Sequence, residues 1–348
     1  MVKKQRIVII GGGLSGLTLA YLLEKKNYEI TLIEASPRLG GRIQTAVGNL
    51  GTPLELGATW FSEAHVQVLS LLAKLEIKKY EQYTKGVSLF QTTKFEPPQL
   101  FSVPEAENPS FRIVDGTECL IDRLKENLLQ TKVILNSKAE HISIDQNDLL
   151  IKTSQSTFRC AKTIICMPPQ LICSIKLPDE IPSHLLNLLP TVQTWMAGSI
   201  KFTLEYEQPF WRKKGYSGML YSHSDIITEM YDHTNFEENK FGFTGFLNSR
   251  ASTLNQETRK ANVLRQLSEL IGKESAYPTA YFDKVWNDEF IIQGNETIEL
   301  PHQNNGHPYL QEGYLDERLF ICGTETSSKF GGYMEGAIRS AIRVADKF

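Results

Sequence analysis

The segment RIVIIGGGLSGLTLAYLLEKKNYEITLIEASPRLGGR, residues 6–42, decides the fold of this chain. Its first apolar run is followed by glycines, a stretch of apolar residues with helical spacing, and a second apolar run that ends at an acidic residue. This order predicts a strand over residues 6–10, a helix over 14–26 and a second strand over 29–33. A strand–helix–strand unit with a glycine-rich first turn is typical of domains that bind a dinucleotide.

The glycines of the first turn have separate predicted roles. Gly11 permits the tight turn, Gly13 lets the backbone approach a pyrophosphate, and Gly16 lets the helix pack close to the strand. The helix N-terminus offers free N–H groups and the positive end of its dipole to a phosphate. Glu34, which ends the second strand, is placed to accept hydrogen bonds from a ribose diol. Because these features occur in the expected order, we interpret the segment as a dinucleotide site rather than an isolated glycine turn.

The residues RLGGR at 38–42 indicate which dinucleotide is bound. Enzymes that bind NAD need no second glycine pair flanked by arginines. The pattern resembles the motif of the large FAD-dependent amine oxidase superfamily, in which the second arginine, here Arg42, sits against the diphosphate. A forked guanidinium suits a phosphate, whereas the alternative is a solvated arginine loop.

Length and composition limit the possible functions. At 348 residues the chain exceeds one ordinary hydrophobic core, so we expect two lobes. The net charge of −3 argues against nucleic acid or an anionic membrane as a partner, because both require a basic surface. No apolar stretch reaches the ~18 residues of a membrane helix, and the first strand begins at Arg6, which leaves no room for a signal peptide. We therefore expect a cytoplasmic protein with no membrane partner, and the oligomeric state stays open, a homodimer included.

Cysteine and histidine residues give no sign of a disulfide framework or a metal site. The five cysteines are odd in number and lack CxxC spacing. The seven histidines form no ligand pair at helical spacing. We therefore expect no metal.

The rest of the chain contains recognisable helices and strands. A proline-rich break at residues 95–111 is interpreted as a linker or lid, and a helix is expected over 116–130. Alternating apolar residues then predict strands at residues 132–135, 139–144, 149–153 and 162–166. Between residues 194 and 246 the strands are rich in aromatic residues, which can wall a pocket, although plain sheet core is expected for most of them. A helix over 255–271 and a final helix from about Tyr333 complete the pattern.

We interpret the chain as an α/β protein with a doubly wound FAD/NAD(P)-binding domain and a smaller α+β substrate domain built on a mixed sheet. Residues 281–286 are expected to lead back to the first domain. The predicted FAD-binding domain is discontinuous and comprises residues 1–80, 108–178 and 286–348. The predicted substrate-binding domain comprises residues 81–107 and 179–285.

Several further motifs together resemble the flavin-containing monoamine and polyamine oxidases. They are ELGATWF at residues 55–61, MPP at 167–169, GSIKFTLEYEQPFWRKKGYSG at 198–218, and GTET and GGYMEGA after residue 322. With the opening unit they occur in the same order as in that family and extend over nearly the whole chain. PFWRKK beside the strand that contains a lysine is especially close to the monoamine oxidase branch.

The resemblance assigns roles to individual residues. Lys201 matches the lysine that holds a water against flavin N5, and Tyr333 matches one aromatic of the cage in front of the flavin. The strand and turn at residues 323–325 match a segment that touches the ribityl and pyrophosphate region. Met334 begins a helix aimed at the pyrimidine edge of the ring, and Ala139 falls where a backbone amide reads adenine. Taken alone, Lys201 could equally be a snorkelling surface lysine, and Tyr333 a simple core residue.

The predicted site residues form three sets. The predicted catalytic residues are Lys201 and Tyr333, and the predicted substrate pocket contains Trp60, Glu296 and Tyr333. The predicted cofactor-binding residues are Gly11, Gly13, Leu14, Ser15, Gly16, Glu34, Ala35, Gly41, Arg42, Gly57, Ala58, Thr59, Trp60, Ala139, Trp286, Gly323, Thr324, Glu325, Tyr333 and Met334.

Three departures from the family pattern matter. Asn295 stands where the monoamine oxidases attach their flavin to a cysteine, so we expect FAD to bind non-covalently. Glu296 stands where the second cage aromatic would follow. The family's large helical insertion in the substrate domain shrinks to roughly residues 81–107, so the pocket is expected to be shallower and more open.

The resemblance implies an enzyme that uses FAD to oxidise a small-molecule amine to an imine, which water hydrolyses to an aldehyde and ammonia while oxygen is reduced to hydrogen peroxide. Two alternatives stay open. One is another FAD-dependent oxidoreductase of the superfamily, such as a C–C desaturase, and the other is a non-catalytic flavoprotein that uses the fold as a binding scaffold. Lys201 and Tyr333 favour amine oxidation, whereas Glu296 and the short insertion weaken that interpretation.

Overall fold

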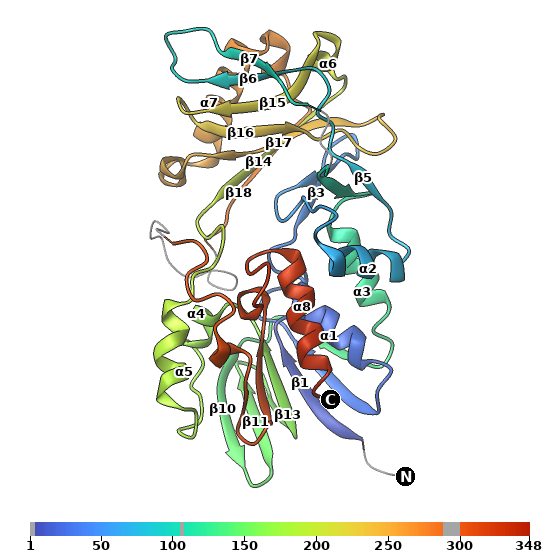
Figure 1. Cartoon of the computed structure of the whole chain (residues 1–348), viewed down its shortest axis with the longest axis vertical. Coiled ribbons are helices and arrows are strands. Elements are labelled where there is room, and N and C mark those ends of the chain that lie inside the picture. The colour runs from blue at the N-terminus through green and yellow to red at the C-terminus, as the bar shows by residue number, and fades with distance from the viewer. Residues whose placement is uncertain (1–3, 105–107, 288–299) are drawn as a thin grey trace.

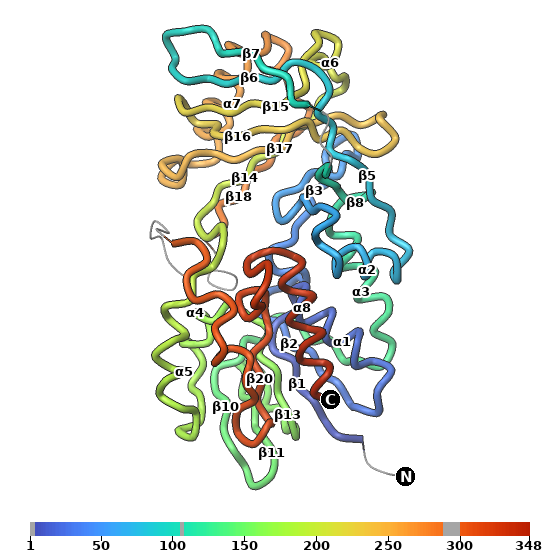
Figure 2. Tube along the Cα trace, viewed as in Figure 1, coloured from blue at the N-terminus to red at the C-terminus, as the bar shows by residue number. Residues whose placement is uncertain are grey.

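The computed structural model describes residues 4–104, 108–287 and 300–348 of the chain. These residues form two lobes, one above the other in Figure 1. The first lobe, at the bottom, contains a six-stranded sheet and both ends of the chain, and the second lobe contains a seven-stranded sheet. The tube in Figure 2 shows that the chain passes between the lobes more than once, so neither lobe is one continuous segment.

The first lobe is built on a sheet in which all neighbouring strands are parallel except the pair at one edge. Its strands are β1 (Gln5–Ile10), β2 (Tyr28–Ile33), β9 (Lys132–Ile134), β13 (Lys162–Cys166), β19 (Gly313–Tyr314) and β20 (Leu319–Cys322). The strand order is β19-β20-β13-β1-β2-β9, and only β19 and β20 are antiparallel. The side chains of β1 alternate between two apolar clusters, because this sheet is buried on both faces.

One face of this sheet is covered by helices, and the other face mainly by a small three-stranded sheet. The helices of the first face are α1 (Leu14–Leu23), α2 (Val66–Lys74), α3 (Glu118–Glu126) and α8 (Met334–Ala345). The opposite face is covered by β10 (Ala139–Asp145), β11 (Asp148–Thr153), β12 (Thr157–Cys160), α4 (Pro169–Ile172), α5 (Ser183–Leu188) and η1 (Leu189–Thr191). The predicted α/β class with a nucleotide-binding sheet is confirmed. A doubly wound fold has helices on both faces of its sheet, whereas here the antiparallel sheet β10-β11-β12 takes the place of helices on much of one face.

The second lobe is built on a mostly antiparallel sheet. Its strands are β6 (Val87–Gln91), β7 (Gln99–Ser102), β14 (Ile200–Tyr206), β15 (Tyr216–Ser222), β16 (Ile227–Asp232), β17 (Phe241–Leu247) and β18 (Ala280–Val285). The order is β18-β14-β17-β16-β15-β6-β7, and only β6 and β15 are parallel. Around the sheet lie α6 (Phe210–Lys213), η2 (Ser249–Thr253), α7 (Gln256–Leu270) and η3 (Lys273–Ala276). The sheet and α7 share one apolar core, in which Phe202, Trp211, Phe243, Val263 and Leu267 are buried.

Short elements complete the fold. They are the strand pair β3 (Thr45–Val47) and β4 (Pro53–Glu55), the strand pair β5 (Lys79–Glu81) and β8 (Phe111–Ile113), and the 3-10 turns η4 (Pro308–Leu310) and η5 (Thr324–Thr326). β4 contacts β14 and β17 of the second lobe. This contact brings the residues after β4 to the junction of the two lobes.

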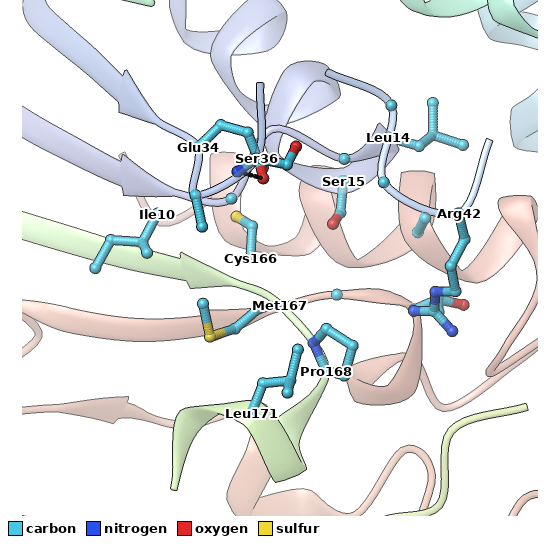
Figure 3. Close-up of a pocket in the computed structure, with 18 of the residues that line it drawn as sticks. Ile10, Leu14, Ser15, Glu34, Ser36, Arg42, Cys166, Met167, Pro168 and Leu171 are labelled. Carbon is cyan, nitrogen blue, oxygen red and sulfur yellow. Dashed lines mark hydrogen bonds between the residues drawn. The ribbon is translucent and has the colours of Figure 1, made fainter. Parts of the chain in front are cut away.

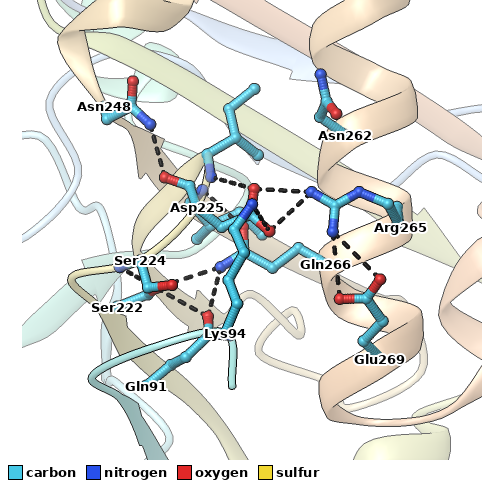
Figure 4. A network of polar contacts seen from close by, with 12 residues as sticks. Gln91, Lys94, Ser222, Ser224, Asp225, Asn248, Asn262, Arg265, Gln266 and Glu269 are labelled. Atoms are coloured by element: carbon cyan, nitrogen blue, oxygen red, sulfur yellow. Dashed lines mark hydrogen bonds and ion pairs between the residues drawn. The ribbon is translucent and has the colours of Figure 1, made fainter. Parts of the chain in front are cut away.

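A polar network fastens α7 to the ends of β6, β15 and β16 in the seven-stranded sheet (Figure 4). Asp225 accepts two hydrogen bonds from Arg265, at 2.7 and 2.8 Å, and pairs with Lys94 at 3.2 Å. The buried Gln266 accepts a hydrogen bond from the backbone N–H of Ile227 at 2.8 Å and donates to Gln91 at 2.9 Å. Since the polar atoms of Gln266 are satisfied, the network holds α7 in place without a desolvation penalty.

The structure differs from the sequence-based predictions in several places. The break at 95–111 contains the edge strand β7, and β12 was missed. Residues 281–285 belong to β18, which pairs with β14 in the sheet of the second lobe. Ile181, Leu185 and Val192 pack in the core of the first lobe, so the chain leaves that lobe after Val192 and not at residue 178. Apart from this correction, the domain boundaries stay a prediction.

Candidate functional site

A cavity lies at the carboxyl ends of β1, β2, β13 and β20, where α1 and α8 begin (Figure 3). In sheets of this kind ligands bind outside the carboxyl ends of the strands, at the point where the strand order reverses. Here that point lies between β1 and β13. The strands that follow β1 first extend the sheet on one side of it, as β2 and β9, and then on its other side, as β13 and β20. We call this cavity the cradle.

The glycines of the first turn have the geometry that a close ligand requires. Gly11 has φ of +110°, and a Cβ there would overlap the carbonyl oxygen of Cys166. Gly13 is different, because its backbone is extended and an added Cβ would approach only Gly41 Cα, at 3.9 Å. The space above Gly13 is therefore open within the protein itself. Gly16 faces inward, where a Cβ would overlap the carbonyl oxygen of Gly11, so it serves the packing of α1 on β1.

Glu34 lies at the end of β2 with its carboxylate held by backbone N–H groups. Gly12 donates to Oε2 at 2.6 Å and Ser36 donates to Oε1 at 2.9 Å, the latter visible in Figure 3. A carboxylate has about four lone-pair positions, so two are left for a ligand that enters the cradle. This arrangement suits the predicted contact with ribose hydroxyls.

Arg42 lines the cradle and is fixed from behind by Glu325. The two side chains form a bidentate pair, with Nη1 to Oε1 at 2.7 Å and Nη2 to Oε2 at 3.1 Å. Glu325 is fully buried and does not line the cradle, so it acts by orienting Arg42. A guanidinium has five N–H donors, which leaves donors for a phosphate.

The cradle fits a long, doubly charged anion with hydroxyl groups. The N-termini of α1 and α8 both open onto it, and neither has a side-chain cap. The hydroxyl of Ser137, which also lines the cradle, is buried without a hydrogen-bond partner among the described residues. Such a hydroxyl calls for a polar partner. The donor set therefore fits a dinucleotide such as FAD.

The structure brings most of the predicted cofactor-binding residues to the cradle. Those that line it are Gly11, Gly13, Leu14, Ser15, Glu34, Ala35, Gly41, Arg42, Ala58, Ala139, Gly323, Thr324, Tyr333 and Met334. Those that lie behind or beside it are Gly16, Gly57, Thr59, Trp60, Trp286 and Glu325. Asn295 and Glu296 lie outside the described residues. Trp286 is buried and donates its indole N–H to the carbonyl of Leu56 at 2.7 Å, which holds the ELGATWF segment in place.

Sequence reasoning did not assign Ser137, Cys166, Met167, Pro168 or Leu171 to the cofactor site, although all of them line the cradle. Met167 and Pro168 follow β13 and Ser137 follows β9. Their position after parallel strands was the available signal, because such strand ends meet at one edge of the sheet.

Lys201 lies on β14 and is buried at the junction of the lobes, with 2% of its surface exposed. Its ammonium donates to the carbonyl of Gly57 at 2.7 Å and to the hydroxyl of Thr59. It also lies 4.8 Å from the ring centre of Trp60. A snorkelling surface lysine is therefore excluded. Burial lowers the pKa of Lys201 to about 7, an effect that the carboxylate of Glu55 opposes.

Glu55 is the buried carboxylate that acts on Lys201. It accepts hydrogen bonds from the backbone of Thr117 and from the hydroxyl of Thr45, the latter at 3.1 Å. Burial raises the pKa of Glu55, while the positive charge of Lys201 lowers it. The two groups are therefore linked, since removing either charge leaves the other without compensation in a water-poor region.

Tyr333 precedes α8 and has 40% of its surface exposed, so it is not a core residue. Its ring stacks on Trp195 at 6.1 Å and on His302 at 6.0 Å between centroids. Trp195 and His302 themselves stack at 4.6 Å. The group was not recognised in the sequence, because its members are more than 30 positions apart and belong to no motif that names them together. Trp195 and His302 therefore each place a ring roughly parallel to that of Tyr333.

An aromatic wall lies on the face of the second sheet that carries Lys201. Trp60 packs against Tyr231 at 5.0 Å and against Phe246 at 6.4 Å. The hydroxyls of Tyr221 and Tyr231 are 2.8 Å apart. Other aromatic residues of these strands, among them Phe202 and Phe243, belong to the core shared with α7. We refer to Trp60, Tyr221, Tyr231 and Phe246 as the aromatic wall.

Other kinds of site find no support in the part of the chain that the structure describes. No group of three or more metal-ligating side chains is found among residues 4–104, 108–287 and 300–348. Within the same ranges, no helix combines the length and apolar character needed to cross a membrane. All five cysteines are free thiols.

Comparison with known proteins connects this geometry to a family. The family described as "Flavin containing amine oxidoreductase" matches residues 14–92 and 88–347. The "Probable flavin-containing monoamine oxidase A" of Dictyostelium discoideum is 22% identical, over 97% of this chain and 96% of its own length. The flavin-containing amine oxidase A of Sus scrofa is also 22% identical, over 97% of this chain and 84% of its own.

Two kinds of solved structure share the fold. Putrescine oxidase bound to putrescine is 19% identical with a TM-score of 0.84, and the similarity covers 99% of each chain. Cyclohexylamine oxidase from Brevibacterium oxydans is 18% identical with a TM-score of 0.85, covering 99% of this chain and 98% of the other. At this identity the likeness concerns the fold.

Proposed function

The chain belongs to the flavin-containing amine oxidoreductase family, and from this premise we propose that it oxidises a small-molecule amine at the junction of its two lobes, with FAD held in the cradle. Buried Lys201 is the observation that carries the proposal. Its ammonium binds the carbonyl of Gly57, whose neighbour Ala58 lines the cradle. The same ammonium lies 4.8 Å from the ring centre of Trp60 and 5.6 Å from that of Phe246, both in the aromatic wall. Lys201 therefore contacts both the segment beside the cradle and the aromatic wall.

The cradle residues divide the recognition of FAD among them. The N–H groups at the start of α1 and the guanidinium of Arg42 would hold the pyrophosphate, and Glu34 the ribose. Ser137 and Ala139 would lie toward the adenosine end, and Gly323, Thr324 and Met334 toward the ring end. When bound, FAD supplies the redox chemistry, taking a hydride equivalent from the C–H beside the amine nitrogen and reducing oxygen to hydrogen peroxide.

The protein favours the neutral form of the substrate amine over its ammonium form. Only a neutral amine has the free electron pair that makes its neighbouring C–H reactive. The aromatic rings of Trp60 and Phe246, which flank the ammonium of Lys201, disfavour the ammonium form of the substrate, and the charge of Lys201 repels it. Water then hydrolyses the released imine to an aldehyde and ammonia.

An anaerobic amine panel tests the proposed function. Purified yellow protein is mixed with amines without oxygen, and the flavin absorbance is followed. We expect at least one amine to bleach the flavin, and admitting oxygen should restore the colour and produce hydrogen peroxide. If no amine bleaches it, a C–C desaturase or a non-catalytic flavoprotein scaffold becomes the better interpretation.

Acid denaturation is expected to release all of the flavin into the supernatant. The reason is chemical, since Asn295, which lies outside the described residues, cannot form a thioether. Cys166 lines the cradle, but burial raises the pKa of its thiol well above the ordinary value and keeps it protonated and unreactive. The absorbance of supernatant and pellet is compared after precipitation. Yellow colour that stays with the precipitated chain would contradict non-covalent binding.

Two further proposals accompany this function. A cytoplasmic location and a homodimer are compatible with the composition and are tested by cell fractionation and by sedimentation.

A further inference from the structure

A row of paired residues crosses the second sheet from β14 to β15. Lys201 pairs with Phe246, Phe246 with Glu229, and Glu229 with Tyr221. Directly paired residues on neighbouring strands project to the same face of a sheet. Lys201 and Glu229 therefore stand on the face of the aromatic wall, separated by the strand that carries Phe246. With a strand spacing of about 4.8 Å, their backbones lie about 10 Å apart.

Glu229 is the acidic member of this row, and its surroundings are mostly aromatic. Its carboxylate is half-buried and interacts with the hydroxyl of Tyr231, which lies 2.8 Å from that of Tyr221. It forms no ion pair among residues 4–104, 108–287 and 300–348. Among the described residues, the charged group that acts on Glu229 is Lys201, whose ammonium is already bound to Gly57 and Thr59. A half-buried carboxylate without a direct cationic partner is costly to keep, because desolvation penalises its charge.

The row carries a positive group at one end of the aromatic wall and a negative group at the other. At the Lys201 end, a substrate amine must be neutral, because a cation is already present there. At the Glu229 end, the negative charge favours an ammonium, and the rings of Phe246, Tyr221 and Tyr231 add faces on which a cation is stabilised. A substrate with two amino groups meets both requirements at once, with one end neutral and the other charged.

Building on the proposed function, we propose that Glu229 binds the distant ammonium group of the substrate, so that the preferred substrates are diamines or other amines with a second cationic group. Glu229 acts as a specificity-determining residue. It fixes which end of the molecule remains charged and therefore which end is presented for oxidation. Because the contact is the same before and during the reaction, its loss should raise KM rather than lower kcat.

The test compares n-alkylamines with α,ω-diamines of the same carbon number, using steady-state kinetics and anaerobic flavin bleaching. We expect the diamine to have a kcat/KM about 10- to 100-fold higher than its matched monoamine, the range of one charge-assisted hydrogen bond. In Glu229→Gln this preference should vanish through a higher KM for the diamine. Glu207→Gln, an exposed carboxylate beyond β14, is the matched control and should keep the preference.

One comparison needs no variant. An ω-amino acid of equal length places a carboxylate beside Glu229, so the unmodified protein should use it at least as poorly as the monoamine. The inference is overturned if monoamines and diamines react alike, or if Glu229→Gln retains flavin and still prefers the diamine. If no amine of any kind bleaches the flavin, the proposed function itself fails, and this result is distinct from bleaching without discrimination.

Discussion

Gly13→Val is expected to produce a folded protein that carries no FAD. The backbone of Gly13 is extended, a conformation that valine adopts readily, and the nearest protein atom to an added Cβ is 3.9 Å away. The backbone and the Cβ of valine therefore fit without a clash. The valine methyl groups would occupy the place where a pyrophosphate meets the N–H groups of α1. Each lost charge-assisted hydrogen bond costs about 1.5–3 kcal/mol, so affinity should fall more than about 100-fold.

The measurement is FAD binding by absorbance and calorimetry, with circular dichroism as the test of folding. Glu34→Ala is the graded comparison and should weaken binding by about 10- to 100-fold. Its effect is smaller because it removes ribose contacts and loosens the N–H groups of Gly12 and Ser36, but does not obstruct the cradle. Equal FAD affinity in all three proteins would show that the cradle is not the FAD site.

Lys201→Met is expected to slow the oxygen-dependent half of turnover by roughly 10²–10³-fold, while FAD stays bound. Oxygen becomes anionic as it is reduced, and the ammonium of Lys201 is placed to stabilise that charge beside the cradle. Methionine keeps the length of the side chain but removes its charge. Stopped-flow spectroscopy separates amine-dependent bleaching from oxygen-dependent recovery of colour. Recovery at the unmodified rate would mean that Lys201 is only structural.

The pH dependence provides a second readout for Lys201. Because its pKa is lowered to about 7, the ammonium is charged below that pH and neutral above it. The oxygen-dependent rate should therefore fall as pH rises through about 7, and this change should be absent in Lys201→Met. Lys152→Met changes an exposed lysine of β11 and is the control, so it should keep the full pH profile.

Loss of the Lys201 charge also leaves Glu55 buried without compensation, so the single variant is expected to be less stable. The double variant Lys201→Met with Glu55→Gln removes both charges. It should recover thermal stability without recovering the oxygen-dependent rate. Recovery of both would show that the rate loss followed from misfolding rather than from the missing ammonium.

The sequence by itself determined the nucleotide-binding half of the fold. β1, the glycine turn, α1 and β2 follow one another within residues 5–33, and their periods of 2 and 3.6 are local properties of the chain. Helix α7 is also determined by local sequence, because its N-cap Asn255 accepts a hydrogen bond from the N–H of Thr258 at 2.9 Å. The motifs also selected Lys201 and Tyr333, but they did not distinguish a buried lysine from one that reaches solvent.

Only the tertiary structure decided which distant residues act together. Glu325 fixes Arg42 from 283 positions away, and Glu55 compensates Lys201 across the lobe junction. The row of Lys201, Phe246 and Glu229 depends on the register of three antiparallel strands. A shift by one residue would turn every side chain to the opposite face, and nothing in the local sequence fixes that register. It is set by packing against α7 and the first lobe, since burying the apolar face stabilises one register over the others.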